Sequence, residues 1–239
     1  MYYITDKNHP VSDLQKKMKK YELIIIKNFF EKSSIINQLS LLRNHIKSKK
    51  IIKISGKNFY KRKNYFRLDC GDYSQVNARF NYMLALFEWN KSFFFKNELK
   101  KIIEFRDNLL NLKKKKNFTY SIKNKNFFNL RKVLFYPSGG GFMNGHKDSY
   151  NNDGFPNFLL CINERKKSST YQEGGGYYIF NNEKFFDAEK YLEPGDLYFH
   201  STKTTHGVKA IDPHKKIYID NFNSGRWVIN LSIEKVIIK

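Results

Sequence analysis

The sequence predicts a mainly β fold, an antiparallel sandwich or barrel of the jelly-roll type, supported by helices packed on one sheet. From about residue 130, short runs rich in Val, Ile, Phe and Tyr follow one another, among them "RKVLFYP", "FPNFLLCI", "GGYYIF" and "RWVINLSIEKVII". Turn sequences such as "PSGGG", "NNDG", "EGGG" and "EPGD" separate these runs. Many short strands without helices between them are typical of a jelly roll.

The first half of the chain, residues 1–129, is expected to be a mixed α/β region that supports this core. The run "YELIIIKNFF" is typical of a buried strand. Ser33 or Ser34 is a candidate N-cap for a following helix with one apolar face. That face consists of Ile35, Ile36, Leu39, Leu42 and Ile46. Further helices are expected around "RFNYMLALFEW" and over "KNELKKIIEFRDNLLNLKKK", and together the helices would cover one sheet and hide its edges.

Residues 1–239 are expected to form one domain, with the β core in residues 130–239, because the sequence shows no repeats and no long Pro- or Ser-rich linker. No run approaches the ~18 apolar residues that a membrane span needs, and "MYYITDKNHP" lacks the pattern of a secretion signal. The two cysteines are too few for a disulfide framework or a zinc cluster. We therefore expect a soluble, cytoplasmic protein.

The formal net charge of +22 has two explanations. A strong positive field attracts nucleic acid, anionic membranes or acidic substrates. Nucleic-acid surfaces, however, usually depend on Arg for paired contacts to phosphates and bases, and here Lys outnumbers Arg 36 to 8. The chain is also rich in Asn, Ile, Phe and Tyr, the residues that an AT-rich genome encodes. Genome composition therefore explains much of the charge without a partner.

The stretch "GHKDS" places His146 and Asp148 two residues apart. If it lies at the end of a strand, both side chains point to the same face, because side chains alternate along a strand. Imidazole and carboxylate groups are suitable ligands for a divalent first-row metal. Two ligands do not complete a site, however, and a His-x-Asp pair alone is equally consistent with a polar surface turn.

The segment "PGDLYFHSTKTTHGVKAI" offers a third ligand. His200 ends the first of two expected strands, where a structural, hydrogen-bonded histidine is expected. His206 begins the next strand beside Gly207, which leaves room for a close ligand. Two histidines and one carboxylate form the facial triad of non-haem Fe(II) oxygenases. Zinc is the competing metal, although the helical His-Glu-x-x-His pattern is absent.

The expected strand "GRWVINLSIEKV" carries a candidate ligand-binding arginine. Alternation places Arg226, Val228, Asn230 and Ser232 on one face. A guanidinium on this otherwise apolar strand is suited to clamp the carboxylate of a bound organic acid through paired hydrogen bonds. The alternative is a surface arginine at the start of a strand.

Taken in this order, the motifs resemble the metal-binding region of the Fe(II)/2-oxoglutarate-dependent dioxygenases, and most of all their prolyl-4-hydroxylase-like branch. Tyr136-Pro137, a glycine-rich turn and His146-x-Asp148 begin the similarity, which continues through "CIN", "EGGGYYIF", "PGDLYFHSTKTTHGV" and "RWVINLSI". It covers about residues 130–237. The resemblance implies a double-stranded β-helix, a cupin-like jelly roll, in agreement with the core expected above.

The resemblance also implies a cofactor set and an activity. Fe(II) would be the metal, 2-oxoglutarate the co-substrate and O2 the oxidant. Carried over by position, the iron ligands are His146, Asp148 and His206. Arg226 would pair with the distal carboxylate of 2-oxoglutarate, Tyr136 would contact the co-substrate through its hydroxyl group, and Asn230 would line the same pocket. The implied reaction is oxidation, first of all hydroxylation, of an unactivated C–H bond in a small molecule or an amino-acid or peptidyl substrate, with release of succinate and CO2. Desaturation and ring formation stay open as alternatives.

Two departures from the family pattern bear on function. A tyrosine that some relatives carry on the strand after the acid ligand is missing, and "LLCIN" stands there. Nucleic-acid-demethylating relatives carry a second arginine on the last strand, where this chain has Glu234. A demethylase therefore stays an alternative that is not favoured, and the intact ligand set argues against a non-catalytic basic binding protein. The substrate is expected to enter beside "SYNNDG"; the sequence leaves its identity and the oligomeric state open.

Overall fold

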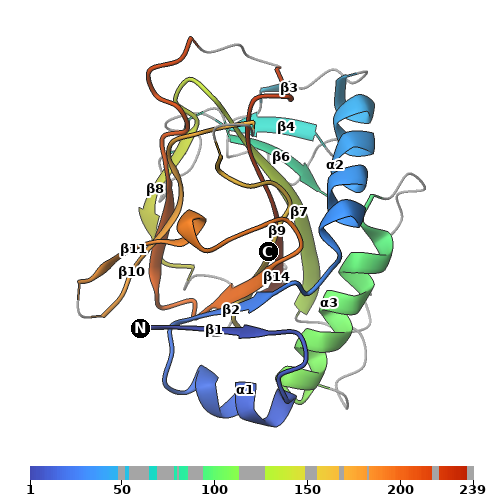
Figure 1. Ribbon diagram of the computed structural model, residues 1–239, viewed down its shortest axis with the longest axis vertical. Coiled ribbons are helices and arrows are strands. Elements are labelled where there is room, and N and C mark those ends of the chain that lie inside the picture. Colours follow the sequence, from blue (N-terminus) through green and yellow to red (C-terminus); the bar gives the residue numbers. More distant parts are fainter. Residues whose placement is uncertain are drawn as a thin grey trace.

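A computed structural model describes residues 1–47, 52–53, 65–68, 78–79, 81–85, 94–112, 127–148, 155–166, 170–181, 183–216 and 221–235. Within these residues, two sheets lie face to face and helices cover the outer side of the larger one. Figure 1 shows α2 and α3 on one side of the larger sheet and β8, β10 and β11 on the other. The helices are α1 (Val11–Met18), α2 (Lys32–Lys47) and α3 (Lys96–Leu109).

The larger sheet has the strand order β1-β2-β12-β9-β14-β7-β6-β4-β3, and the smaller one has the order β11-β10-β13-β8-β5. The strands of the larger sheet are β1 (Tyr2–Asp6), β2 (Leu23–Lys27), β12 (Leu197–His200), β9 (Asn157–Cys161), β14 (Gly225–Lys235), β7 (Phe127–Pro137), β6 (Asn81–Ala85), β4 (Tyr65–Leu68) and β3 (Ile52–Lys53). Those of the smaller sheet are β11 (Phe185–Asp187), β10 (Gly175–Ile179), β13 (Thr205–Lys209), β8 (Phe142–His146) and β5 (Ala78–Arg79). Apart from the parallel pairs β1–β2 and β3–β4, neighbouring strands are antiparallel, as the jelly-roll prediction requires.

The larger sheet buries an apolar layer on each face. On the outer face, Leu39 of α2 and Leu99 of α3 belong to the same core as Trp227 of β14. On the inner face, Val228 of β14 belongs to a second core that includes Tyr178 of β10 in the opposite sheet. Consecutive residues of β14 thus face different cores, because side chains alternate along a strand. The candidate site lies in the inner layer, between the sheets.

The first predicted helix is confirmed as α2, with two corrections. Four of the five residues assigned to its buried face are indeed buried, but Ile36 is 46% exposed. Because the helix already begins at Lys32, Ser33 and Ser34 lie within its first turn and do not cap it. The third predicted helix is confirmed as α3, in which Leu99 is fully buried. Among the described residues, no helix is both long and apolar enough to cross a membrane.

The helix predicted around "RFNYMLALFEW" is wrong. The described part of this segment forms strand β6 and the end of β5. Strand β6 pairs with β4 on one side and with β7 on the other, where Tyr82 lies opposite Phe135. The backbone N–H and C=O groups along the edge of the long strand β7 need hydrogen-bond partners. Pairing with β7 therefore outweighs the local helix propensity of Met, Leu and Ala.

Candidate active site

The three predicted metal ligands meet at one end of the inner layer. His146 ends β8 and His206 lies in β13, and the two residues are cross-strand partners. Their ring centroids are 4.4 Å apart. Asp148 follows two residues after β8 and is held in place by its backbone N–H, which donates to the carbonyl oxygen of Thr202 over 3.1 Å. Lys147, between the ligands, is exposed, as alternation predicts.

The geometry of the triad fits a divalent metal. One carboxylate oxygen of Asp148 lies 3.4 Å from Nε2 of His146, and the other lies 3.1 Å from Nε2 of His206. One ligand atom from each residue can be chosen so that all three lie within 4.8 Å of one another. Nδ1 of His146 contacts the carbonyl oxygen of Asn144 at 3.0 Å, and Nδ1 of His206 contacts that of Thr204 at 3.1 Å.

These carbonyl contacts decide which nitrogen atom serves as the ligand. A carbonyl oxygen only accepts hydrogen bonds, so each Nδ1 carries a proton and Nε2 is the nitrogen atom left to bind a metal, once it has given up any proton that it shares with Asp148. Both Nε2 atoms face Asp148. This arrangement of an outer hydrogen bond behind each histidine is typical of metal sites, where it orients the ring.

The charges within the triad are strongly coupled. Burial raises the pKa of Asp148, but the positive charge of His206 and hydrogen bonds from both histidines outweigh burial and bring this pKa well below its usual range. Burial lowers the pKa of His206, and the Asp148 carboxylate outweighs that effect and raises it. The carboxylate therefore stays ionised, as a metal ligand must be.

Two polar residues that lie beside the triad were not assigned to it from the sequence. Asn157 of β9 donates a short hydrogen bond from its Nδ2 to Asp148, and it lies opposite His200 of β12. The ring of His200 is 4.2 Å from that of His206 between centroids, and its Nδ1 contacts the carbonyl oxygen of Ser201 at 3.1 Å. Burial, and then the charge of His206, lowers the pKa of His200 to about 3, so this histidine is neutral.

Arg226 points into the inner layer, as the predicted alternation of β14 requires, and is only 4% exposed. The alternative of a surface arginine is therefore wrong. Its Nε donates to Oε1 of Glu189 over 2.6 Å, and its Nη2 donates to the hydroxyl oxygen of Tyr198 over 3.2 Å. Burial lowers the pKa of Arg226, but the Glu189 carboxylate outweighs burial and raises this pKa well above its usual value.

Tyrosines surround this arginine. Tyr136 lies opposite Arg226 across the β7–β14 pair, is 1% exposed, and has its ring 6.0 Å from the guanidinium carbon. Its hydroxyl group donates to Sδ of Met143 over 3.8 Å. Tyr198 of β12 lies opposite Leu159 of β9, the strand on which the family tyrosine is missing. The Tyr198 hydroxyl group thus lies beside the guanidinium of Arg226, on the strand next to β9.

Asn230 lies four residues after Arg226 on β14, on the same face of the strand. It lies opposite Leu159 of β9. Its side-chain oxygen is buried, and no hydrogen-bond partner contacts it among the described residues. Residues 149–154, beside which the substrate was expected to enter, lie outside the described residues.

Sequence reasoning missed Glu189. It lies in a one-turn 3-10 helix, η3 (Ala188–Lys190), inside a stretch that reads as an ordinary polar turn. It is nevertheless 5% exposed. The one sequence signal near it is the glycine run of the turn "EGGG", because a Cβ atom on Gly175 would lie 2.2 Å from Cγ of Glu189.

Comparison with solved structures identifies the fold. No protein-family model and no curated protein sequence matches the chain significantly. A prolyl-4-hydroxylase of Pseudomonas putida superposes with a TM-score of 0.57 at 10% identity, over 95% of this chain and 100% of that one. A prolyl hydroxylase of Trichoplax adhaerens, in complex with a peptide from hypoxia-inducible factor, gives 0.57 at 15% identity, over 94% and 88% of the two chains. A 2OG-Fe(II) oxygenase-family oxidoreductase of Burkholderia pseudomallei gives 0.55 at 9% identity, over 98% and 94%.

The chain therefore has the double-stranded β-helix fold of the prolyl-4-hydroxylases and 2OG-Fe(II) oxygenases. On this fold it carries a His-Asp-His triad, formed by His146, Asp148 and His206. Such low sequence identities establish the fold alone, so function has to be argued from the site.

Proposed function

We propose that this chain is an Fe(II)- and 2-oxoglutarate-dependent oxygenase that hydroxylates a C–H bond. The observation that carries the proposal is the convergence of two histidine nitrogen atoms and one carboxylate oxygen within 4.8 Å of one another. Two histidines and one carboxylate are the ligand set of non-haem Fe(II) oxygenases, and three protein ligands leave other positions on the metal open.

Each residue of the site has a role in this proposal. His146, Asp148 and His206 hold the iron, while Asn157 fixes the carboxylate of Asp148 through its hydrogen bond. Arg226 is suited to receive the distal carboxylate of 2-oxoglutarate. When bound, iron and 2-oxoglutarate supply the oxidising chemistry, in which O2 oxidises a substrate C–H bond while 2-oxoglutarate becomes succinate and CO2.

We infer that the substrate is a small molecule or an amino-acid or peptidyl group with a polar atom near the oxidised carbon. Two observations support this inference. Nε2 of His200 and Oδ1 of Asn157 are buried beside the triad, and neither has a hydrogen-bond partner among the described residues. Because buried polar atoms are normally hydrogen-bonded, a bound substrate is a suitable partner for them.

The proposal is tested by following succinate release and O2 consumption with Fe(II), 2-oxoglutarate and a panel of amino acids, peptides and small metabolites. We expect succinate formation in the wild-type protein and none in His146→Ala. The matched control is His214→Ala, which removes an exposed histidine and is expected to leave the rate unchanged. Equal succinate formation by His146→Ala and wild type would contradict the proposal.

A further inference from the structure

The arginine expected to bind an external carboxylate already contacts one that belongs to the protein. Oε1 of Glu189 accepts hydrogen bonds from Nε of Arg226 at 2.6 Å and from the backbone N–H of Gly176 at 2.8 Å. Oε2 accepts from the hydroxyl group of Tyr171 at 2.5 Å. Glu189 and Tyr171 are almost fully buried. Three donors thus fix this carboxylate against one edge of the guanidinium.

The fold makes room for this ion pair. A Cβ atom on Gly176 would lie 3.0 Å from Nη2 of Arg226 and 3.1 Å from Oε1 of Glu189. Gly175 has a positive φ of 111°, and a Cβ atom there would collide with Glu189. The two glycines of β10 therefore provide the space in which the ion pair forms.

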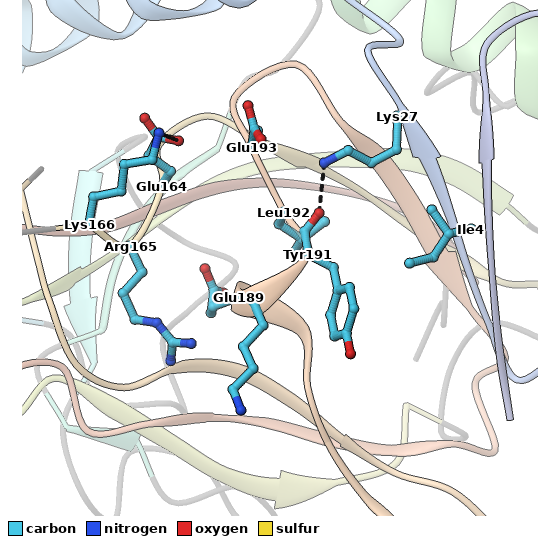
Figure 2. A pocket seen from close by; sticks show the side chains of 10 residues that line it. Ile4, Lys27, Glu164, Arg165, Lys166, Glu189, Tyr191, Leu192 and Glu193 are labelled. Atoms are coloured by element: carbon cyan, nitrogen blue, oxygen red, sulfur yellow. Dashed lines mark hydrogen bonds and ion pairs between the residues drawn. The ribbon is translucent and has the colours of Figure 1, made fainter.

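Glu189 reaches the ion pair from η3, whose Ala188 belongs to the inner core. It lines a cavity of about 400 Å³. Figure 2 shows it in this lining together with Tyr191. The lining of this cavity includes none of the triad residues. Several of its charges are paired within the protein, for example Lys27 with Asp196 and Arg165 with Asp187. We therefore assign no ligand to the cavity and attribute the role of Glu189 to its contact with Arg226.

The bonding of Arg226 leaves part of the guanidinium available. Its Nε is bonded to Glu189 and its Nη2 to Tyr198, and neither of these bonds uses the N–H groups of Nη1. Tyr198 accepts the bond from Nη2, so its own O–H remains a donor. A carboxylate that arrives here finds N–H and O–H donors, but it also meets the negative charge of Glu189 nearby.

We propose that Glu189 is a built-in counter-ion for Arg226, which balances the buried guanidinium in the ligand-free protein and lowers the affinity of the site for dicarboxylates. The inference rests on the proposed function. A buried, unpaired guanidinium is costly, so the ligand-free protein needs a counter-ion. Because 2-oxoglutarate and its product succinate carry the same distal carboxylate, a moderated affinity allows the product to leave as readily as the co-substrate enters.

The test is calorimetric titration of the Mn(II)-loaded protein, which binds without turning over. We expect Glu189→Gln, which keeps the shape but removes the charge, to bind 2-oxoglutarate and succinate about tenfold more tightly than wild type. Pyruvate, a 2-oxo acid without a distal carboxylate, should bind equally to both proteins. The matched control is Glu193→Gln, which removes a half-exposed carboxylate nearby and should change neither affinity.

A second measurement covers the case in which Glu189→Gln folds poorly. Because a ligand that binds only the folded state stabilises it, 2-oxoglutarate with Mn(II) should then restore folding, and pyruvate should not. The inference is overturned if Glu189→Gln binds 2-oxoglutarate no more tightly than wild type, or if the affinity for pyruvate changes to the same extent. Failure of the wild-type protein to bind 2-oxoglutarate at all would instead refute the proposed function.

Discussion

At the scale of single residues, Asn157 shows how a residue outside the triad orients one of its ligands. Its Nδ2 donates to Asp148, whose other oxygen faces His146. We predict that Asn157→Ala weakens metal binding about 10- to 100-fold, the usual effect of removing such an outer hydrogen bond. Titration with Mn(II) or Co(II) measures this. Asn223→Ala, at an exposed asparagine, is the control; equal affinities for both variants would refute the role of Asn157.

The grouping of His146, Asp148 and His206 was predictable from the sequence, whereas its surroundings were not. Period-two alternation at a strand end predicted that His146 and Asp148 lie together, and the structure groups both with His206, the histidine that the neighbouring glycine favoured. His200 was expected to be structural, and its Nδ1 does bond to a backbone carbonyl oxygen. The ion pair of Arg226 with Glu189 joins residues 37 positions apart through a turn with no periodic pattern, so only the tertiary structure reveals it.

At the scale of elements, α2 tests how the helices stabilise the larger sheet. Leu39 is 3% exposed in the outer core, whereas Leu41, two residues along the same helix, is 57% exposed. We predict that Leu39→Ala lowers the free energy of unfolding by about 2–5 kcal/mol, since it removes buried apolar surface and leaves a cavity. Leu41→Ala should change it by less than about 0.5 kcal/mol. Urea denaturation of both variants measures the difference, and similar losses would contradict the packing described here.

A second element-scale prediction concerns the turn after β13. The buried carboxylate of Asp212 accepts hydrogen bonds from the backbone N–H groups of Gln172 and Glu173, both at 2.8 Å, and from the Ser138 hydroxyl at 2.7 Å. Burial raises the pKa of Asp212, but hydrogen bonds from Lys215 and these groups outweigh it, and the net pKa is lowered.

Because the folded-state pKa of Asp212 is depressed, its contribution to stability is present above the unfolded value of about 3.9 and is lost as the pH falls below it. We predict that Asp212→Asn is less stable than wild type by about 1–3 kcal/mol at pH 7. The difference should shrink as the pH falls below about 4. Thermal unfolding at several pH values measures it, with the more exposed Asp13→Asn as the control. A difference that persists unchanged into acid would contradict this assignment.

The sequence predicted the elements of the second half better than those of the first. The strands after residue 130 were identified because β-branched and aromatic runs alternate with glycine-rich turns. In the first half, "NYMLA" forms β6 instead of a helix because β7 offers it an edge. The short helix α1 and strand β1 were not predicted, since each is held mainly by neighbours distant in sequence. Strand β1, for example, pairs with β2, and β2 with β12.

At the scale of the whole molecule, the support region and the β core share one apolar layer. Ile35 of α2 and Ile102 of α3 lie in the same core as Ile229 of β14. We therefore predict a single cooperative unfolding transition, in which the calorimetric and van't Hoff enthalpies agree. Two separate transitions would contradict the prediction that residues 1–239 form one domain.

The central claim is that the inner end of this β-helix binds Fe(II) and 2-oxoglutarate. The most direct measurement adds both, without O2, and records the visible spectrum. We predict a weak metal-to-ligand charge-transfer band that saturates at one equivalent of 2-oxoglutarate and is absent in His146→Ala. If no band forms in the wild-type protein, and His146→Ala binds 2-oxoglutarate equally well, the account is wrong.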